Sequence, residues 1–278
     1  MHLSSSHWTA LLLLTYFLLV ASTCEETADP GPLPEDLTKE RRERLGEILH
    51  DAILQSPRDF PILDRASKGD SVIQEYIQTL YNQATQRIRL DRSSPESNRW
   101  QQDREWLVTI IDDPNRFAFS LPSGYFYIST GFLESIQKGY EIYYLLAFEA
   151  INVNQQYLLE NLSNKYGIST LVDLAENPAS FSPLAIEEIL EFLQKDIEYE
   201  PTIIQEIDEA TAELICSSSI FDRFGIIPLL DFLNAREQWR DTRPSYADRL
   251  QFLTSLPIDN CGEIKSTGAY QKMVLDNL

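Results

Sequence analysis

Histidine is scarce in this chain of 278 residues. Two of its three histidines, His2 and His7, lie in the N-terminal apolar stretch, which leaves His50 for the rest of the sequence. A zinc site built on two imidazoles, or a nucleophile activated by a histidine base, needs more than this. His50 lies in a helical segment with a charged face, where we expect a surface side chain rather than a metal ligand.

Positive charge is also in short supply. The chain has 23 Lys and Arg against 43 Asp and Glu, which gives a formal net charge of −20. A polyphosphate backbone would be repelled by such a surface, so the composition argues against nucleic-acid binding. Adhesion to anionic lipid through a basic patch is disfavoured for the same reason.

The sequence has no apolar run long enough to cross a bilayer. The run at residues 11–20 has about a dozen apolar residues with its flanks, whereas a span needs roughly 20. Small residues and then Cys24 follow it, which predicts a signal peptide at 1–23, with a buried N-terminal helix as the alternative. Residues 24–34 are acidic and rich in proline, as expected of a tether.

Cysteine is rare as well. Cys24 stands where an exported bacterial lipoprotein carries its lipid, so we expect lipidation there and a periplasmic, membrane-anchored or secreted protein of the cell envelope. The other two, Cys216 and Cys261, form an even pair that an oxidising compartment would allow to join. Two unpaired thiols are the open alternative.

Helical periodicity dominates the remaining sequence. We expect one domain at 35–278, with a helical lead-in at 35–100, a core at 101–256 and a tail at 257–278. Two segments, "REWLVTIIDD" and "RFAFSLPSGYFYIST", are rich in β-branched and aromatic residues and predict two or three short strands. The fold class is therefore α+β, mainly helical, with a small β-sheet near its middle. The helices expected after the strands are Phe132–Gln137, Tyr140–Asn161, Pro183–Lys195, Thr202–Ser217, Pro228–Glu237 and Tyr246–Ser255.

The stretch from Phe119 to Asn152 carries a recognisable order of motifs. "NRFAFSLPSGYFYISTGFL" is followed by the helical segment "EIYYLLAFEAIN". This text resembles the zinc peptidases of the HtpX, BepA and prenyl-protease type, family M-48, in which "NAFalPgGyifvytGll" precedes "ELAaVLAHEiaH". The resemblance covers roughly Arg104 to Leu253 and implies a gluzincin-like peptidase fold.

The metal ligands of that family are missing here. The family binds zinc with two histidines four residues apart on one helix face, with a glutamate between them as general base. Those histidine positions hold Phe148 and Asn152 in this chain, and Glu149 keeps the general-base position. We therefore expect no zinc and no other cofactor.

The third ligand of the family is a glutamate in the pattern Glu-x-x-Ala-Asp. "EATAE" places Glu209 at that position and Glu213 in place of the aspartate, with Glu206 as a competing register. "RPSYADRL" resembles the family's "HPsxxeRi", with Arg243 in place of the histidine and Arg249 kept. We expect Arg243 to pair with Glu149, Glu209 or both, where the metal would lie. The resemblance implies a cleft lined by Phe119, Pro122, Gly124, Glu213, Arg243 and Arg249.

The functional expectation is a pseudopeptidase of the cell envelope. The strand Phe117–Leu121 would hold an extended peptide or protein partner by strand addition, which needs no metal. One alternative is an active metalloendopeptidase with a rebuilt oxygen-rich site from Glu149, Asn152 and Glu209. Another is a structural envelope lipoprotein whose cleft is closed.

Overall fold

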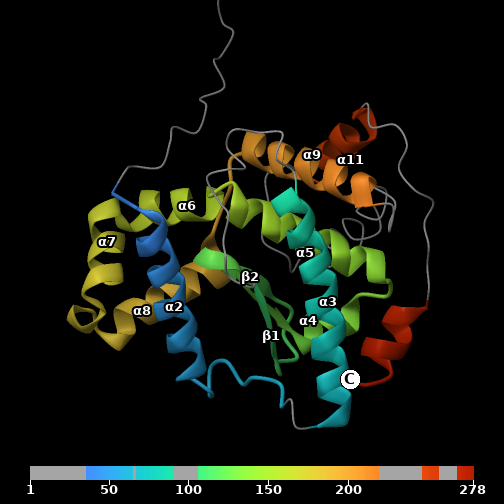
Figure 1. Ribbon diagram of the computed structural model, residues 1–278, viewed down its shortest axis with the longest axis horizontal. Helices are drawn as coiled ribbons and strands as arrows, with labels where there is room; N and C mark the ends of the chain where they lie inside the picture. Colours follow the sequence, from blue (N-terminus) through green and yellow to red (C-terminus); the bar gives the residue numbers. More distant parts are fainter. Residues whose placement is uncertain (1–35, 65–66, 91–105, 219–245, 257–267) are drawn as a thin grey trace, which may run out of the picture. The chain divides into compact units, whose positions relative to one another are not determined.

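The computed structural model describes residues 36–64, 67–90, 106–218, 246–256 and 268–278. The chain divides into two compact units, Met1–Leu33 and Pro34–Leu278, and every described residue belongs to the second. Within it three short strands lie among helices (Figure 1), so the mainly helical α+β class with a small sheet is confirmed. No helix in the described part of the chain combines the length and apolar character needed to span a bilayer.

The elements follow one another in this order: α2 (Lys39–Leu54), α3 (Lys68–Leu90), β1 (Leu107–Ile111), β2 (Ala118–Leu121), η2 (Pro122–Gly124), β3 (Tyr125–Ser129), α4 (Thr130–Ser135), α5 (Gly139–Asn154), α6 (Tyr157–Tyr166), α7 (Ile168–Glu176), η3 (Pro178–Ser180), α8 (Pro183–Glu191), η4 (Phe192–Asp196), α9 (Pro201–Ser218), α11 (Tyr246–Ser255) and η6 (Gln271–Leu275).

The sheet has the strand order β1-β3-β2, with β1 parallel and β2 antiparallel to β3. A tight turn at η2 joins β2 to β3, and Ser123 and Gly124 in it have φ angles of 71° and 83°. Ser123 is held in this left-handed conformation by its hydroxyl, which donates to the backbone oxygen of Arg42, 3.0 Å away. A side chain on Gly124 would collide with Trp106, whose ring lies 2.4 Å from the added Cβ.

One face of the sheet packs against α2. Phe119 and Tyr127 stack with ring centroids 5.1 Å apart, and the Nδ1 atom of His50 lies 2.5 Å from the Tyr127 hydroxyl. The His50 ring also stacks on Tyr125 at 4.3 Å. His50 is therefore half-buried and part of the packing between α2 and the sheet, which corrects the expectation of a surface side chain. Burial raises the pKa of Tyr127, since its phenolate would lose hydration.

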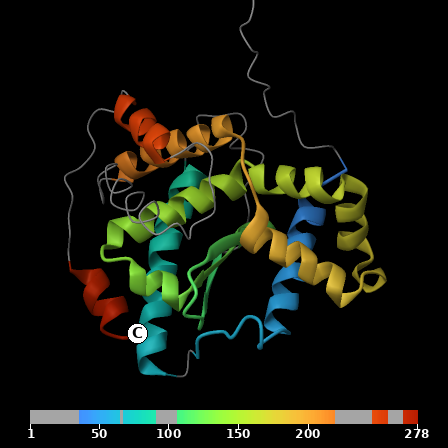
Figure 2. The same cartoon turned by 180° about the vertical axis from the view of Figure 1, so that it is seen from behind.

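The other face packs against α3 and α5. Phe126 lies against Tyr81 of α3, with ring centroids 5.6 Å apart, and Ser120 of β2 contacts Glu149 of α5. Both views of the ribbon place the sheet between α2 and α3 (Figures 1 and 2). The two lead-in helices are thus integral to the core, and the sheet is covered on both faces.

The helices differ from the expected pattern in three places. The expected helix Tyr140–Asn161 is broken, because Gln156 has a φ of 69° between α5 and α6. Helix α7 and the turn η6 were not expected. The expected helix Pro228–Glu237 lies outside the described residues, whereas α11 spans Tyr246–Ser255 as predicted.

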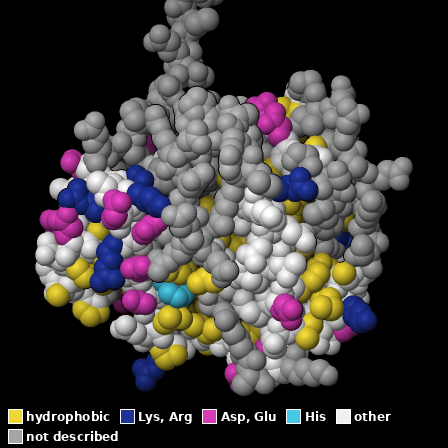
Figure 3. All heavy atoms as spheres, viewed as in Figure 1, with side chains coloured by type: hydrophobic (Ala, Val, Ile, Leu, Met, Phe, Trp, Pro, Cys, Tyr) yellow, Lys and Arg dark blue, Asp and Glu magenta, His cyan; other side chains and the backbone are white. Residues whose placement is uncertain are grey.

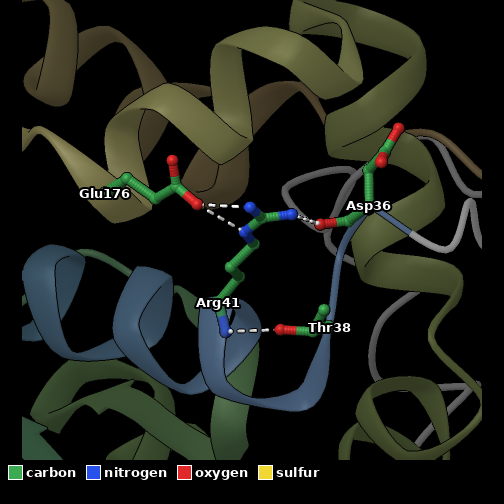
Figure 4. A network of polar contacts seen from close by, with 4 residues as sticks. All are labelled: Asp36, Thr38, Arg41 and Glu176. Atoms are coloured by element: carbon green, nitrogen blue, oxygen red, sulfur yellow. Dashed lines mark hydrogen bonds and ion pairs between the residues drawn. The ribbon is translucent and has the colours of Figure 1, made fainter.

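The start of α2 is fixed by a network of polar contacts (Figure 4). The Thr38 hydroxyl caps the helix by accepting from the Arg41 backbone amide at 3.4 Å. The Arg41 guanidinium donates to the Asp36 backbone oxygen and to the carboxylate of Glu176 at the end of α7. Acidic and basic side chains are interspersed over the region of α2 and α7 on this side of the molecule (Figure 3).

Candidate functional site around helix α5

Helix α5 carries the positions that the motif singled out. It begins after Lys138, where the Glu141 carboxylate accepts from the backbone amides of Gln137 and Lys138 at 3.0 and 3.2 Å. This arrangement satisfies amide groups that a helix start leaves without partners. The helix is apolar on almost every side because the sheet, α3 and α9 surround it.

Glu149 points from α5 towards the sheet and is 6% exposed. The Ser120 hydroxyl of β2 donates to its Oε2 atom at 2.8 Å. Burial, and to a lesser extent the Glu149 charge, raise the pKa of Tyr81 from α3. Glu149 is thus a buried acid held by the sheet, rather than one that faces open solvent.

Asn152 is 1% exposed. Its Nδ2 atom donates to the hydroxyl of Tyr199 at 2.7 Å, and Tyr199 lies two residues before α9. Its Oδ1 atom has no hydrogen-bond partner among the described residues. The amide therefore ties α5 to the segment that leads into α9.

Phe148 lies half-buried beside an arginine of α11. The guanidinium carbon of Arg249 is 5.5 Å from the centroid of the Phe148 ring, and Tyr144 stacks on the same ring at 6.4 Å. A cation over an aromatic face is attracted by the ring quadrupole, and the attraction is largest where water is excluded. Arg249 is only 5% exposed.

Asp208 of α9 completes this group and is fully buried. Its two carboxylate oxygens accept from Nε and Nη2 of Arg249 at 2.8 and 2.7 Å, and the Tyr144 hydroxyl donates to it at 2.8 Å. Burial opposes the charge of Arg249, but the adjacent Asp208 raises its pKa. Burial and Asp208 together raise the pKa of Tyr144. We call Tyr144, Phe148, Asp208 and Arg249 the arginine cluster.

The placement of α9 differs from the expected register. Asp208, rather than Glu209, faces α5, and the side chains of Glu209 and Glu213 are exposed. Glu206, the competing choice, accepts a hydrogen bond from Tyr157 at the start of α6. The expectation that Glu209 lies beside Glu149 in a cleft is therefore wrong, because helical periodicity turns its side chain away from the packed face of α9.

The two contacts between α5 and α9 also define their relative direction. Tyr144 contacts Asp208, whereas Asn152, eight residues later on α5, contacts Tyr199, nine residues earlier in the chain. The helices are therefore antiparallel. One turn before Asp208, at the level of Phe148, α9 carries Ile204, which is 1% exposed.

Three of the remaining expected residues lie outside the described part of the chain: Arg243, Cys24 and Cys261. The acid–arginine pairing that we expected of Arg243 is made by Arg249 with Asp208 instead. Cys216 of α9 is disulfide-bonded to a partner that also lies outside the described residues.

The expected cleft is filled where Phe119 lies. Phe119 is 1% exposed and packs between Tyr127 and Phe60. Gly124 is buried against Trp106, while Pro122 lies beside a hollow between α2 and the start of α6. The residues that line this hollow are Lys39, Arg42, Glu43, Pro122, Ser123, Val153, Leu158 and Leu159.

Sequence reasoning did not identify four residues of the site. These are Ser120, Tyr144, Tyr199 and Asp208, and each is joined to its partner across 29 to 64 positions of the chain. A sequence signal existed for Asp208, since its spacing from the apolar positions Ile204, Ile207 and Ile215 predicts an inward side chain.

Comparison with known proteins gives a distant relationship. No family model matches the chain. The mitochondrial metalloendopeptidase OMA1 of Homo sapiens is 24% identical over 172 residues, which cover 54% of this chain and 32% of that protein. OMA1 of Bos taurus is similar to the same extent. This distant similarity supports a peptidase-like scaffold. The chain spans about a third of the length of these relatives.

A metallopeptidase relationship raises the question of which side chains here would fit a metal. Phe148 and Ile204 have no lone pair to offer. Asn152 has one buried amide oxygen without a partner among the described residues, which suits hard cations better than zinc, and one oxygen of Glu149 accepts from Ser120. Within the ranges that the structure describes, no three His, Cys, Asp or Glu side chains gather closely enough to hold an ion. This donor set does not fit catalytic zinc, which takes three nitrogen, sulfur or carboxylate ligands.

Proposed function

We propose that this protein is a catalytically inactive, metallopeptidase-like protein that binds peptide or protein partners. The arginine cluster is the observation that carries the proposal. At the level of the helix where a metallopeptidase holds its ion, Arg249 lies over Phe148 and is bound on two atoms by Asp208. This guanidinium cannot lose its proton at neutral pH and engages both oxygens of Asp208, so the cluster offers a divalent ion no free carboxylate oxygen.

The α9 register supports the loss of the metal further. In the family pattern Glu-x-x-Ala-Asp, Asp208 takes the place of the aspartate when the inward-facing residue is matched, and the ligand position then falls on Ile204. All three ligand positions would hold residues that are poor or useless zinc donors. Structural zinc sites gain about 10–16 kcal/mol of apparent binding energy from their donors acting together, and this chain would forfeit most of it.

Partner binding does not depend on that chemistry. β2 is an edge strand, and an extended peptide can add to such an edge through main-chain hydrogen bonds alone. The proposal therefore places the partner along β2, beside Phe119 and the buried Glu149.

The proposed compartment is the cell envelope, outside the cytoplasm. The apolar run with its small-residue ending and Cys24 support export and lipidation. The disulfide at Cys216 agrees with an oxidising compartment. Mass spectrometry of the mature N-terminus tests this part: a lipid on Cys24 supports it, and an intact residue 1 contradicts it.

Metal content together with proteolysis tests the loss of activity. Purified protein is incubated with equimolar zinc, dialysed, and measured by elemental analysis, and cleavage of unfolded casein is followed with and without a chelator. We expect much less than one zinc per chain and no chelator-sensitive cleavage. Stoichiometric zinc with cleavage that the chelator abolishes would establish an active metalloendopeptidase instead.

A double variant provides the control for zinc loading. Phe148→His with Asn152→His places two imidazoles one turn apart on α5, a spacing that suits one metal ion. This variant should retain more zinc than the wild type under the same dialysis. If the variant and the wild type retained equal amounts of zinc, the ion could not reach this face of α5. The identity of residues 148 and 152 would then not explain why the wild type binds little zinc.

A further inference from the structure

The edge of β2 that faces away from β3 pairs with no other strand that the structure describes, yet it is shielded from solvent. The Ser129 amide donates to the Phe117 backbone oxygen at 3.0 Å, which fixes the pairs 117:129, 119:127 and 121:125 as the hydrogen-bonded ones. The backbone groups of Ala118 and Ser120 therefore point away from β3, towards the edge. Yet both residues are 2% exposed, so something other than water lies there.

Among the described residues, the segment that lies beside this edge is η4 with the residues that follow it. The faces of the sheet are taken by α2 and by α3 with α5, and β2 also contacts η4. Both ribbon views draw the chain between α8 and α9 beside β2 (Figures 1 and 2). Leu193 in η4 is 1% exposed and Ile197 is 3% exposed. This segment, Phe192–Tyr199, is called the cover.

The cover has features of a part that can move. It is an interruption of regular helix, since α8 ends at Glu191, η4 is a π-helical turn and α9 begins at Pro201. Such turns recur at functional sites. At its end the Tyr199 hydroxyl bonds to Asn152 at 2.7 Å. The exposed Lys195 to Glu191 contact lies within its own helical stretch. Phe192 packs edge-on against Tyr166 and lies under Lys165, each 5.7 Å away, so these contacts join the cover to α6 rather than to β2.

We propose that the cover is a removable lid on the β2 edge, and that the partner is an extended, mainly apolar peptide that pairs with Ala118 and Ser120 when the cover lifts. The apolar character follows from the residues that the peptide replaces, Leu193 and Ile197. Tyr199 acts as the latch, because its bond to Asn152 is formed only when the cover is closed. This inference rests on the proposed peptide-binding function and adds its regulation.

Two measurements on one set of variants test the proposal. Tyr199→Phe removes the latch. Tyr166→Phe is the matched control, because it keeps the ring that packs on Phe192 and removes only a hydroxyl that donates to the Glu188 backbone oxygen on the exposed side of α8. Leu193→Ser loosens the cover by a second route. Amide hydrogen exchange is measured at Ala118 and Ser120, with Phe119, which bonds to β3, as the internal reference.

The probe for binding is a fluorescein-labelled decapeptide of alternating valine and threonine. Its control is the same peptide with alternate backbone nitrogens methylated, which cannot donate to a strand edge. Tyr199→Phe should speed exchange at Ala118 and Ser120 and tighten probe binding, each about fivefold, the factor that corresponds to one net hydrogen bond. Tyr166→Phe should change neither, and the methylated peptide should not bind.

Exchange at Ala118 and Ser120 that is unchanged in both Tyr199→Phe and Leu193→Ser would overturn the lid, whatever the probe does. Probe binding that is equal in all proteins would also overturn it, while the proposed peptide binding would stand. Faster exchange without any probe binding, even in the variants, would contradict the proposed peptide binding and leave a cover with no occupant.

Discussion

At the residue scale, the arginine cluster shows how a charge is accommodated where water is excluded. Arg249 and Asp208 have side chains that are 6% and 0% exposed, and each satisfies the other through two hydrogen bonds. Burying either charge alone would lower the free energy of unfolding. Here Asp208 and Arg249 bind each other, and Tyr144 donates a further hydrogen bond to Asp208. The exposed pair of Arg41 with Glu176 faces water and is screened by salt.

Asp208→Asn should therefore destabilise the fold strongly. The substitution leaves a buried guanidinium without its counter-charge, which should lower the free energy of unfolding by about 3–5 kcal/mol. Glu176→Gln is the control, and it should cost less than about 1 kcal/mol because the pair is exposed. Urea unfolding followed by circular dichroism measures both. Equal small losses would mean that Asp208 and Arg249 are not paired in solution.

Glu160 predicts a dependence of stability on pH. Its partial burial, and then the nearby Glu206, raise its pKa above the ordinary value of 4.5. The folded state therefore binds its proton more tightly than the unfolded state, and stability falls as pH rises through the range just above 4.5.

Glu160→Gln should accordingly stabilise the protein at pH 7 by a few tenths of a kcal/mol, a small effect because the side chain is partly hydrated. The gain should vanish near pH 3, where the wild-type carboxyl is protonated in both states. Paired unfolding curves at the two pH values measure it. A gain that is the same at both pH values would assign the effect to something other than the charge.

At the element scale, α2 approaches the η2 turn so closely that one glycine decides the contact. A Cβ on Gly46 would lie 2.1 Å from the Pro122 backbone oxygen and 3.0 Å from the Ser123 Cβ. Alanine favours a helix over glycine by about 1 kcal/mol, but a forced separation of α2 from the turn works against that gain. Because both partners are backbone or near-backbone atoms, neither can rotate away.

Gly46→Ala should thus lower stability by roughly 1–3 kcal/mol, the range for overpacked sites. Gly139→Ala in α5 is the control, because the nearest atom there, at 2.8 Å, is the Tyr76 hydroxyl, the movable end of a side chain. Gly139→Ala should therefore lower the free energy of unfolding by less than Gly46→Ala does. Thermal unfolding of both variants decides the order, and a stable Gly46→Ala protein would indicate a looser contact between α2 and the turn.

The elements also show how far periodicity carries a prediction. The β-branched and aromatic runs predicted β1, β2 and β3, and the apolar spacing predicted α2, α3, α9 and α11. The break between α5 and α6 was not predicted, because Gln156 adopts a left-handed φ of 69° without the glycine that usually marks such a turn. Helix α7, which follows Gly167, was also missed.

At the scale of the whole molecule, the disulfide of Cys216 fastens α9, the helix that carries Asp208. Peptide mapping under non-reducing conditions should find Cys216 linked to Cys261, and a Cys24→Ser variant should keep that linkage. A Cys24 to Cys216 linkage would contradict both the pairing and a lipid on Cys24. Reduction should lower the free energy of unfolding by about 2–5 kcal/mol, which a denaturant titration with and without reductant measures.

The sequence by itself determined the strand and helix composition of the fold, the isolation of Glu149 without histidine neighbours, and the scarcity of positive charge. These properties are written in local patterns of 2 and 3.6 residues and in counts of residue types. Only the tertiary structure decided that the inward Asp208 pairs with Arg249 and Tyr144, that Arg249 lies over Phe148, and that η4 lies beside β2. Each of these contacts joins side chains far apart in the chain, and their selection depends on the packing of helices around the sheet rather than on any local preference.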